Sequence, residues 1–168
     1  MAIDEKLAGR VSAALADASH ARSQEQEEQV MMRRIGVGAL FYLVPTFALG
    51  FVWHLVAFKD YYDRLAMYRH DVIIPFGLLS MAAQAVLFAW VFDRAFAGRL
   101  ASVGRRALAF AAFGAVLSWS FTTVAVAAKN VMTSVPDYLL IETAFTVVQW
   151  AIVGPLMALS YSRARAAS

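Results

Sequence analysis

The sequence predicts an all-α polytopic membrane protein: a bundle of four transmembrane helices preceded by a cytoplasmic N-terminal amphipathic helix. Composition is the first observation, because 61% of the 168 residues are hydrophobic and only 16% are charged. An ordinary soluble domain has about 45–50% apolar and about 25% charged residues. The second observation is a set of four long apolar stretches, and the third is the position of the basic residues at their ends.

Each of the four apolar stretches is long enough to cross a bilayer, which takes about 20 mostly apolar residues. We expect the spans at about residues 35–58, 72–91, 108–128 and 139–161. Three of them contain proline (Pro45, Pro75 and Pro155), which membrane helices tolerate. The transmembrane domain is therefore expected at 35–161, between an N-terminal segment at 1–34 and a cytoplasmic tail at 162–168.

The distribution of Lys and Arg predicts the orientation of the chain. Eleven of these residues lie before the first span, between the second and third spans, or after the fourth, whereas four lie in the other two loops. Positively charged loops stay in the cytoplasm. We therefore expect both termini in the cytoplasm. The basic residues of the cytoplasmic segments account for the pI near 9.4. The sequence carries no nucleic-acid-binding signature that would give this charge another role.

The segment before the first span has its own pattern. Ile3, Leu7, Val11 and Leu15 recur every four residues, which places them on one face of a helix. The run Ser23–Gln29 is polar and acidic, which predicts a solvated extension. Three interpretations stay open for this segment: a loosely ordered tail, a helix that docks on a partner subunit, and an anchor on the membrane surface.

Polar side chains inside the spans predict a polar vestibule, because such groups are costly at membrane depth. Glu142, Thr146 and Gln149 share one face of the fourth span by their spacing. The ionisable groups collect in the outer half of the membrane and the glutamines near its middle. We expect the vestibule to open outward, with the candidate residues His54, Gln84, Ser118, Thr122, Lys129, Glu142, Thr146 and Gln149.

Simpler roles compete with the vestibule. Glu142 could pair with Lys129 or with a helix N-terminus, or it could form a proton or cation site with His54. The glutamines could serve as hydrogen-bonding groups between helices.

The loop between the first two spans carries three acidic and three basic residues together with several tyrosines. Tyr61, Leu65 and Tyr68 are spaced for one face of a short helix in the headgroup layer, and Asp60 and Arg64 are spaced for an ion pair. The loop could be an aromatic belt with a solvated surface. It could also be an outer docking surface or lid, made by Tyr61, Tyr62, Arg64 and Tyr68.

Three segments carry a resemblance: WHLVAFKDYYDRLAMYRHDVIIPFGLLSM (Trp53–Met81), AAKN (Ala127–Asn130) and LLIETAF (Leu139–Phe145). With these segments the chain resembles a family of small, uncharacterised bacterial four-helix integral membrane proteins, over roughly residues 38–161. The resemblance implies four-helix architecture and the bacterial inner membrane. It implies no activity, and no catalytic residue is carried over.

The motifs of most enzyme classes are absent from the sequence. It has no HExxH motif, no P-loop and no Rossmann fingerprint. The absence of cysteine excludes disulfides, cysteine-zinc sites, iron–sulfur clusters and thiol catalysis. A single intramembrane histidine disfavours bis-histidine haem ligation. We therefore expect no enzymatic activity, no metal, no cofactor and no nucleic-acid partner.

Three functions remain as hypotheses. The first is an accessory, assembly or scaffolding subunit of a larger membrane complex. The alternative is a small dimeric transporter or ion- or proton-coupled carrier that uses the outward-facing vestibule. The third is an enzyme acting on a lipid or quinone at the outer leaflet, lined by Trp53, Tyr61, Tyr62 and Trp119. The expected partners are membrane lipid and either another protein or a second copy of this chain.

Overall fold

The structure is a computed structural model that describes the backbone of residues 2–69, 71–100 and 102–166. Side chains are described for residues 15, 17–69, 71–100 and 102–162. Within this part of the chain the regular structure is helical throughout, and no strand occurs. The chain divides into two compact units, Met1–Arg34 and Ile35–Ser168.

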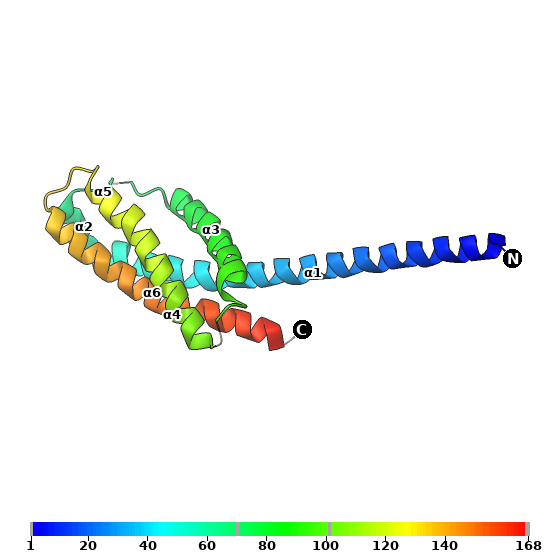
Figure 1. Cartoon of the computed structure of the whole chain (residues 1–168). Coiled ribbons are helices and arrows are strands. Elements are labelled where there is room, and N and C mark those ends of the chain that lie inside the picture. Colours follow the sequence, from blue (N-terminus) through cyan, green and yellow to red (C-terminus); the bar gives the residue numbers. More distant parts are fainter. Residues whose placement is uncertain (1, 70, 101, 167–168) are drawn as a thin grey trace. The chain divides into compact units, whose positions relative to one another are not determined.

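Helices make up most of the chain (Figure 1), and short π-helical turns continue three of them. A π-turn directly follows the first, third and fourth α-helices. In chain order the elements are α1 (Ala2–Val52), η1 (Trp53–Ala57), α2 (Lys59–Leu65), α3 (Ile74–Val91), η2 (Phe92–Phe96), α4 (Val103–Ser118), η3 (Trp119–Val124), α5 (Ala125–Ala127) and α6 (Val135–Ala166).

Four helices are long and apolar enough to cross a membrane: Asp17–Ala57, Ile74–Phe96, Val103–Ala127 and Val135–Ser162. The predictions of an all-helical fold and of four apolar helices are confirmed. Each helix overlaps one predicted span, but the ends differ by several residues. Hydropathy finds the apolar part of a helix, whereas capping decides where the helix begins. The Ser102 side chain, for example, accepts the Arg105 backbone N–H at 3.2 Å and starts α4 before its apolar stretch.

The first unit, Met1–Arg34, is helical wherever its backbone is described. Residues 17–30 are exposed at every position, and Leu15 is 65% exposed. The other three members of the predicted apolar face, Ile3, Leu7 and Val11, lie outside the described side chains. The polar run Ser23–Gln29 is helical as well, because Gln and Glu are good helix formers.

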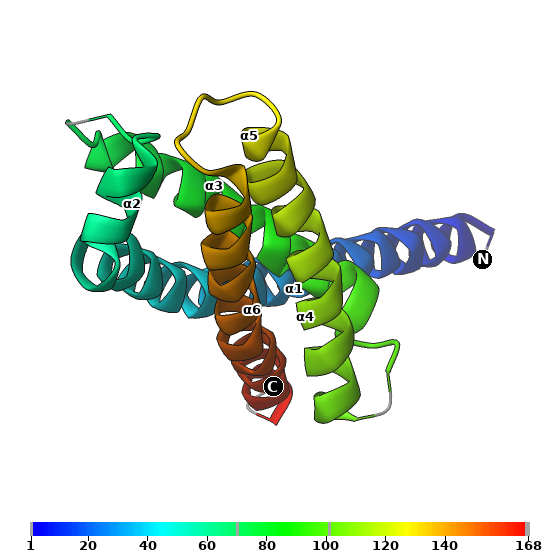
Figure 2. The same ribbon diagram turned by 90° about the vertical axis from the view of Figure 1, so that its left-hand side faces the viewer.

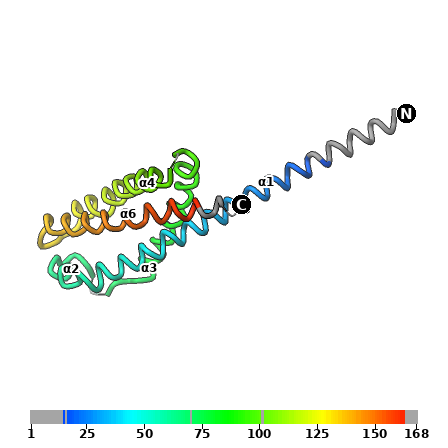
Figure 3. The backbone as a smooth tube through the Cα atoms, turned by 90° about the horizontal axis from the view of Figure 1, so that it is seen from below, coloured from blue at the N-terminus to red at the C-terminus, as the bar shows by residue number. Residues whose placement is uncertain are grey.

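In the second unit, α4 and α6 lie side by side and run in opposite directions (Figures 2 and 3). Glycines allow the close approach. A Cβ atom on Gly154 would lie 2.7 Å from the Ala111 Cβ, and one on Gly114 would lie 2.1 Å from the Trp150 ring. Small residues at a helix contact bring two backbones together, which is how membrane helices gain packing energy.

An aromatic core joins the four apolar helices. The Phe88 and Trp150 ring centroids lie 5.1 Å apart, and those of Phe92 and Phe110 lie 5.0 Å apart. Tyr42 extends the core, with its centroid 5.1 Å from that of Phe88. These edge-to-face and tilted contacts favour a single packing arrangement. This core fixes the positions of α1, α3, α4 and α6 around the site described below.

The loop between the first two apolar helices differs from its prediction. Helix α2 ends at Leu65, and Ala66 has a left-handed φ of 52°, so Tyr68 lies beyond the helix. The predicted face of Tyr61, Leu65 and Tyr68 is therefore wrong, and Tyr62 is buried together with Leu65. The left-handed residue ends the helix because it redirects the chain.

An ion pair within α2 and two hydrogen bonds from the loop before α6 accompany this chain reversal. The α2 ion pair joins Lys59 and Asp63, rather than the predicted Asp60 and Arg64. Its hydrogen bond raises the pKa of the Lys59 ammonium group. Thr133, in the loop before α6, donates its backbone N–H to the Leu65 carbonyl (3.1 Å) and its hydroxyl to the Arg64 carbonyl (2.7 Å). The two loops are thereby tied together.

Candidate functional site

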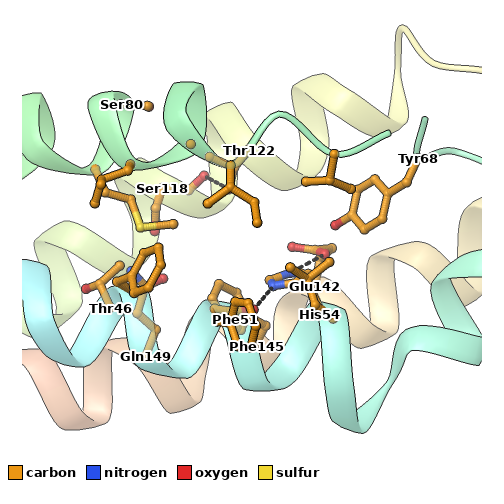
Figure 4. Close-up of a pocket in the computed structure, with 18 of the residues that line it drawn as sticks. Thr46, Phe51, His54, Tyr68, Ser80, Ser118, Thr122, Glu142, Phe145 and Gln149 are labelled. Atoms are coloured by element: carbon orange, nitrogen blue, oxygen red, sulfur yellow. Dashed lines mark hydrogen bonds and ion pairs between the residues drawn. The ribbon is translucent and has the colours of Figure 1, made fainter. Parts of the chain in front are cut away.

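A cavity of about 590 Å³ lies within the second unit, lined by α1, α3, α4, α6 and the loop before α3. Six of the eight predicted vestibule residues line it: His54, Gln84, Ser118, Thr122, Glu142 and Gln149. Two polar groups of residues stand apart in it, with Phe51 and Phe145 between them (Figure 4). We call the group around His54, Glu142 and Tyr68 the acidic end, and the group around Thr46, Gln84 and Gln149 the amide end.

Two predicted residues, Lys129 and Thr146, do not line the cavity. Lys129 is exposed in the turn after α5. Thr146 is buried on α6 but lies outside the cavity wall. At about 100° per residue, Thr146 is turned about 40° from Glu142, whereas Gln149 is turned about 20° in the opposite direction. The wall of the cavity follows the Gln149 side of α6, which also carries Tyr138 and Phe145.

The acidic end is built around the Glu142 carboxylate. The His54 Nε2 atom lies 3.2 Å from Glu142 Oε1, and the Tyr62 hydroxyl donates to the same oxygen at 2.7 Å. The second ring nitrogen of His54, Nδ1, lies 2.9 Å from the Gly50 carbonyl oxygen. Glu142 is 6% exposed, so these contacts replace most of its hydration. Glu142 therefore pairs with His54 and Tyr62 in place of Lys129.

The geometry fixes how many protons the pair holds. A carbonyl oxygen only accepts hydrogen bonds, so His54 Nδ1 must carry a hydrogen. The contact between Nε2 and Oε1 also needs one hydrogen, since both atoms otherwise present lone pairs. That hydrogen belongs either to an imidazolium facing a carboxylate or to a carboxylic acid facing a neutral imidazole. In both forms the pair is electrically neutral and holds one exchangeable proton.

Two tyrosines accompany the pair. The rings of Tyr62 and Tyr68 are stacked, with centroids 5.0 Å apart. Burial, and then the nearby charge of Glu142, raises the pKa of both phenols above the ordinary value of 10.0. Both hydroxyls therefore stay protonated at neutral pH and remain hydrogen-bond donors. Tyr62 uses its donor on Glu142, while Tyr68 lies in the cavity wall.

His54 occupies a π-helical turn. The Phe58 N–H bonds the Trp53 carbonyl five residues earlier at 3.0 Å. Such a turn inserts an extra residue into the helix and is often found at functional sites. The Phe145 ring packs edge-on against the imidazole, with centroids 4.5 Å apart. The imidazole is thereby held in place from α1 and α6 at once.

At the amide end most polar atoms have partners within the chain. The Tyr42 hydroxyl donates to Gln84 Oε1 at 3.0 Å, and Gln84 Nε2 donates to the Ser80 hydroxyl at 3.2 Å. Gln149 is buried in the wall. Thr46 is also buried in the wall, at 4% exposed, and lies beside the Tyr42 side chain.

The hydroxyls of Ser118 and Thr122 donate to backbone carbonyls one turn earlier in the same helical segment. Ser118 donates to the Gly114 carbonyl at 2.7 Å and accepts the Trp150 indole N–H at 2.7 Å. Thr122 donates to the Ser118 carbonyl at 2.7 Å. These two residues shape the cavity wall, and their hydroxyl hydrogens are already used.

The predicted docking residues fall into two groups. Tyr68 lines the acidic end of the cavity, and Tyr62 lies outside the wall and donates to Glu142. Tyr61 donates to the Asp137 carbonyl at 3.4 Å, and the Arg64 guanidinium lies 5.4 Å from the Tyr61 ring centre. Tyr61 and Arg64 thus lie on the side of α2 that joins the start of α6.

Tyr42 and Thr46 were missed from the sequence although a signal was present. Tyr42, Thr46, Gly50 and His54 follow one another at intervals of four residues, and all four line the cavity. Gly50 and His54 are spaced by four residues and so share one face of the helix. Extending it by two further intervals of four toward the N-terminus would have found the other two.

The chemistry available at this site is limited and specific. Among the described residues, no group of three or more His, Cys, Asp or Glu side chains could hold a metal ion. What the site offers is one exchangeable proton beside a largely apolar cavity. Comparison of the chain with protein-family models, curated proteins and solved structures finds no match.

Proposed function

We propose that this chain is a proton-coupled carrier of the bacterial inner membrane, which binds a small amphipathic molecule in the cavity and exchanges protons at His54 and Glu142. One observation carries the proposal: a neutral pair with one exchangeable proton lies in the wall of a cavity of about 590 Å³. Ionisable groups at membrane depth are expensive and generally mark a transport path or a proton relay.

The shape of the cavity supports uptake of a molecule. Residues 71–80 are exposed at every position, and several of them, including Ile74, Gly77 and Leu78, also line the cavity. The cavity is therefore open along the first half of α3. A lipophilic molecule could enter there from the surrounding lipid. Two copies of the chain would supply eight helices for a transport path, which supports a dimer as the working unit.

The proposed topology places both termini in the cytoplasm, because the basic residues favour that orientation. The acidic end of the cavity then lies toward the outer face and the amide end toward the middle of the membrane. A cysteine introduced at either terminus should resist a membrane-impermeant thiol reagent in intact cells, and the chain supplies no competing cysteine. Labelling of the termini from outside would contradict this topology.

The test of the carrier is a pH gradient in proteoliposomes. We expect at least one amphipathic probe among a cation, an anion and a neutral molecule to dissipate the gradient when the wild-type protein is present. The Glu142→Gln variant should abolish this effect, because the amide keeps the shape and cannot exchange a proton. Asp63→Asn is the matched control, since Asp63 is exposed and outside the cavity wall. Equal activity of all three proteins would contradict the proposal.

An accessory subunit is the second candidate, favoured by the first unit. Residues 17–30 form a charged helix that is exposed at every position, as a docking segment would be before its partner binds. Purification in mild detergent followed by mass spectrometry tests it. Recovery of a stoichiometric partner that is lost on deleting residues 1–30 would support this role, and recovery of the chain alone would count against it.

A further inference from the structure

We propose that the cavity takes lipophilic organic cations, and that each bound cation replaces the single proton held between His54 and Glu142. This inference rests on the proposed function and adds the charge and chemical class of the ligand. It stands on two observations: the neutral pair in the cavity wall and the aromatic side chains beside it.

The charge of the pair favours a cation. With its proton the pair is neutral, and without it the pair carries a charge of −1 in a site where Glu142 is 6% exposed. A buried charge that has lost its partner is strongly unfavourable. An incoming cation restores neutrality, whereas a neutral molecule leaves the charge uncompensated and an anion adds to it. Only a cation therefore competes with the proton.

The side chains around the pair suit an organic cation. Phe51, Tyr68 and Phe145 line the cavity next to His54 and Glu142 (Figure 4). Aromatic ring faces attract cations, and the attraction is stronger where water is excluded. A metal ion fits poorly, because Ca²⁺ takes six to eight oxygen ligands and the described residues offer no group of three metal-ligating side chains. The structure thus favours a bulky cation with an apolar surface.

The amide end of the cavity carries no charge. At this end the Tyr42 hydroxyl donates to Gln84 Oε1 at 3.0 Å, and Thr46 and Gln149 lie beside the Tyr42 side chain. These polar groups are uncharged, so they neither attract nor repel the charge of the ligand.

The other ionisable groups of the cavity wall do not exchange with the ligand. Arg69 is exposed and stays charged, so it lowers cation affinity equally at every pH. Tyr62 donates to Glu142, and the raised pKa values of Tyr62 and Tyr68 keep both phenols neutral. Tyr138 donates its hydroxyl to the Thr122 carbonyl at 2.9 Å. The His54 and Glu142 pair remains as the proton donor.

The exchange balances in charge and atoms. Before binding, the site is neutral, with one proton between His54 and Glu142, and the cation is free in lipid or water. After binding, the cation faces the Glu142 carboxylate, His54 is neutral with its hydrogen on Nδ1, and one proton has passed to water. The occupied site is neutral again. Cation affinity should therefore rise about tenfold per pH unit as long as the pair is protonated in the empty site.

The test is calorimetry of the full-length protein in lipid nanodiscs with two isosteric probes of opposite charge, tetraphenylphosphonium and tetraphenylborate. Titrations in two buffers of different ionisation enthalpy count the protons released. We expect tetraphenylphosphonium to release close to one proton per bound ion and to bind about tenfold more tightly per pH unit. Tetraphenylborate should release none.

Variants and controls separate this inference from the proposed function. Glu142→Gln should lose most of the tetraphenylphosphonium binding and all of the proton release, because it has no carboxylate to neutralise the cation, and Asp63→Asn should behave as wild type. Wild-type binding of the cation without proton release, or tighter binding of tetraphenylborate, overturns the cation assignment and leaves the carrier proposal standing. Failure of both probes to bind, together with failure of every probe in the proteoliposome assay, overturns both. The wild-type measurements decide the matter even where a variant fails to fold.

Discussion

Removing the Tyr62 hydroxyl should raise the pH at which the His54 and Glu142 pair releases its proton. That hydroxyl donates to Glu142 Oε1 at 2.7 Å. Release of the proton changes the pair from neutral to −1, and a donor bound to the carboxylate stabilises the charged form more than the neutral one. The Tyr62→Phe variant loses this advantage and therefore holds its proton to a higher pH.

The size of the shift follows from the strength of the hydrogen bond. A neutral hydrogen bond contributes about 1 kcal/mol and one to a charged group about 1.5–3 kcal/mol. The difference is about 1 kcal/mol where the proton leaves the Glu142 carboxyl group. It is smaller where the proton leaves the imidazolium, because the carboxylate is then charged both before and after release. At about 1.36 kcal/mol per pH unit the midpoint should rise by less than one unit. Tyr61→Phe is the matched control, because Tyr61 is the neighbouring residue and its hydroxyl bonds the Asp137 carbonyl at 3.4 Å.

The assay is a pH titration of isotope-labelled histidine followed by NMR. The chain contains three histidines, and the His54 ring signals are assigned by their absence in a His54→Gln variant. We expect the His54 Nε2 signal to titrate at a higher pH in Tyr62→Phe than in wild type or Tyr61→Phe. An unchanged or lower midpoint in Tyr62→Phe would refute the argument that this hydroxyl stabilises the deprotonated pair.

Two further predictions concern packing and alkaline pH. Gly114→Ala places a Cβ atom 2.1 Å from the buried Trp150 ring and should destabilise the protein by about 1–3 kcal/mol in thermal unfolding. Gly104→Ala is the control in the same helix, because its Cβ atom meets nothing within 4 Å, and it should leave stability unchanged or raise it. Equal effects of the two substitutions would contradict this packing. Because the pKa of the buried Tyr62 is raised from 10.0 in the folded state, stability should be complete below about pH 10 and fall above it, by up to about 1.4 kcal/mol per pH unit. The pKa of Tyr68 is raised as well, but Tyr68 is 38% exposed and should contribute less, because water screens its interactions. Replacing both tyrosines with phenylalanine should reduce this alkaline loss, and an unchanged loss would contradict it.

The long apolar helices could be predicted because lipid imposes a simple rule on the sequence. A helix must present about 20 mostly apolar residues to span the hydrocarbon layer, and this rule does not depend on neighbouring helices. The polar residues inside the spans were also evident, because few such residues occur there. His54 and Glu142 could therefore be named as a candidate pair from the sequence.

The partners of these polar groups could not be predicted, because they depend on how the helices rotate and pack. Lys129 was an equally good partner for Glu142 by position, yet it lies in an exposed turn. The hydrogen bond from Tyr62 depends on α2 folding back toward α6, where Tyr62 and Leu65 pack with Tyr138 and Ile141. A left-handed alanine, Ala66, directs that chain reversal, and alanine carries no signal for it.

The most direct measurement is photolabelling with a lipophilic ammonium compound that carries a photoactivatable group, followed by mass spectrometry of the labelled residues. The account predicts labels on cavity residues such as Phe51 and Phe145, increasing with pH and lost in Glu142→Gln. Labels confined to lipid-facing positions such as Phe121 and Leu140, which are both 69% exposed, with no response to pH or to that substitution, would contradict it.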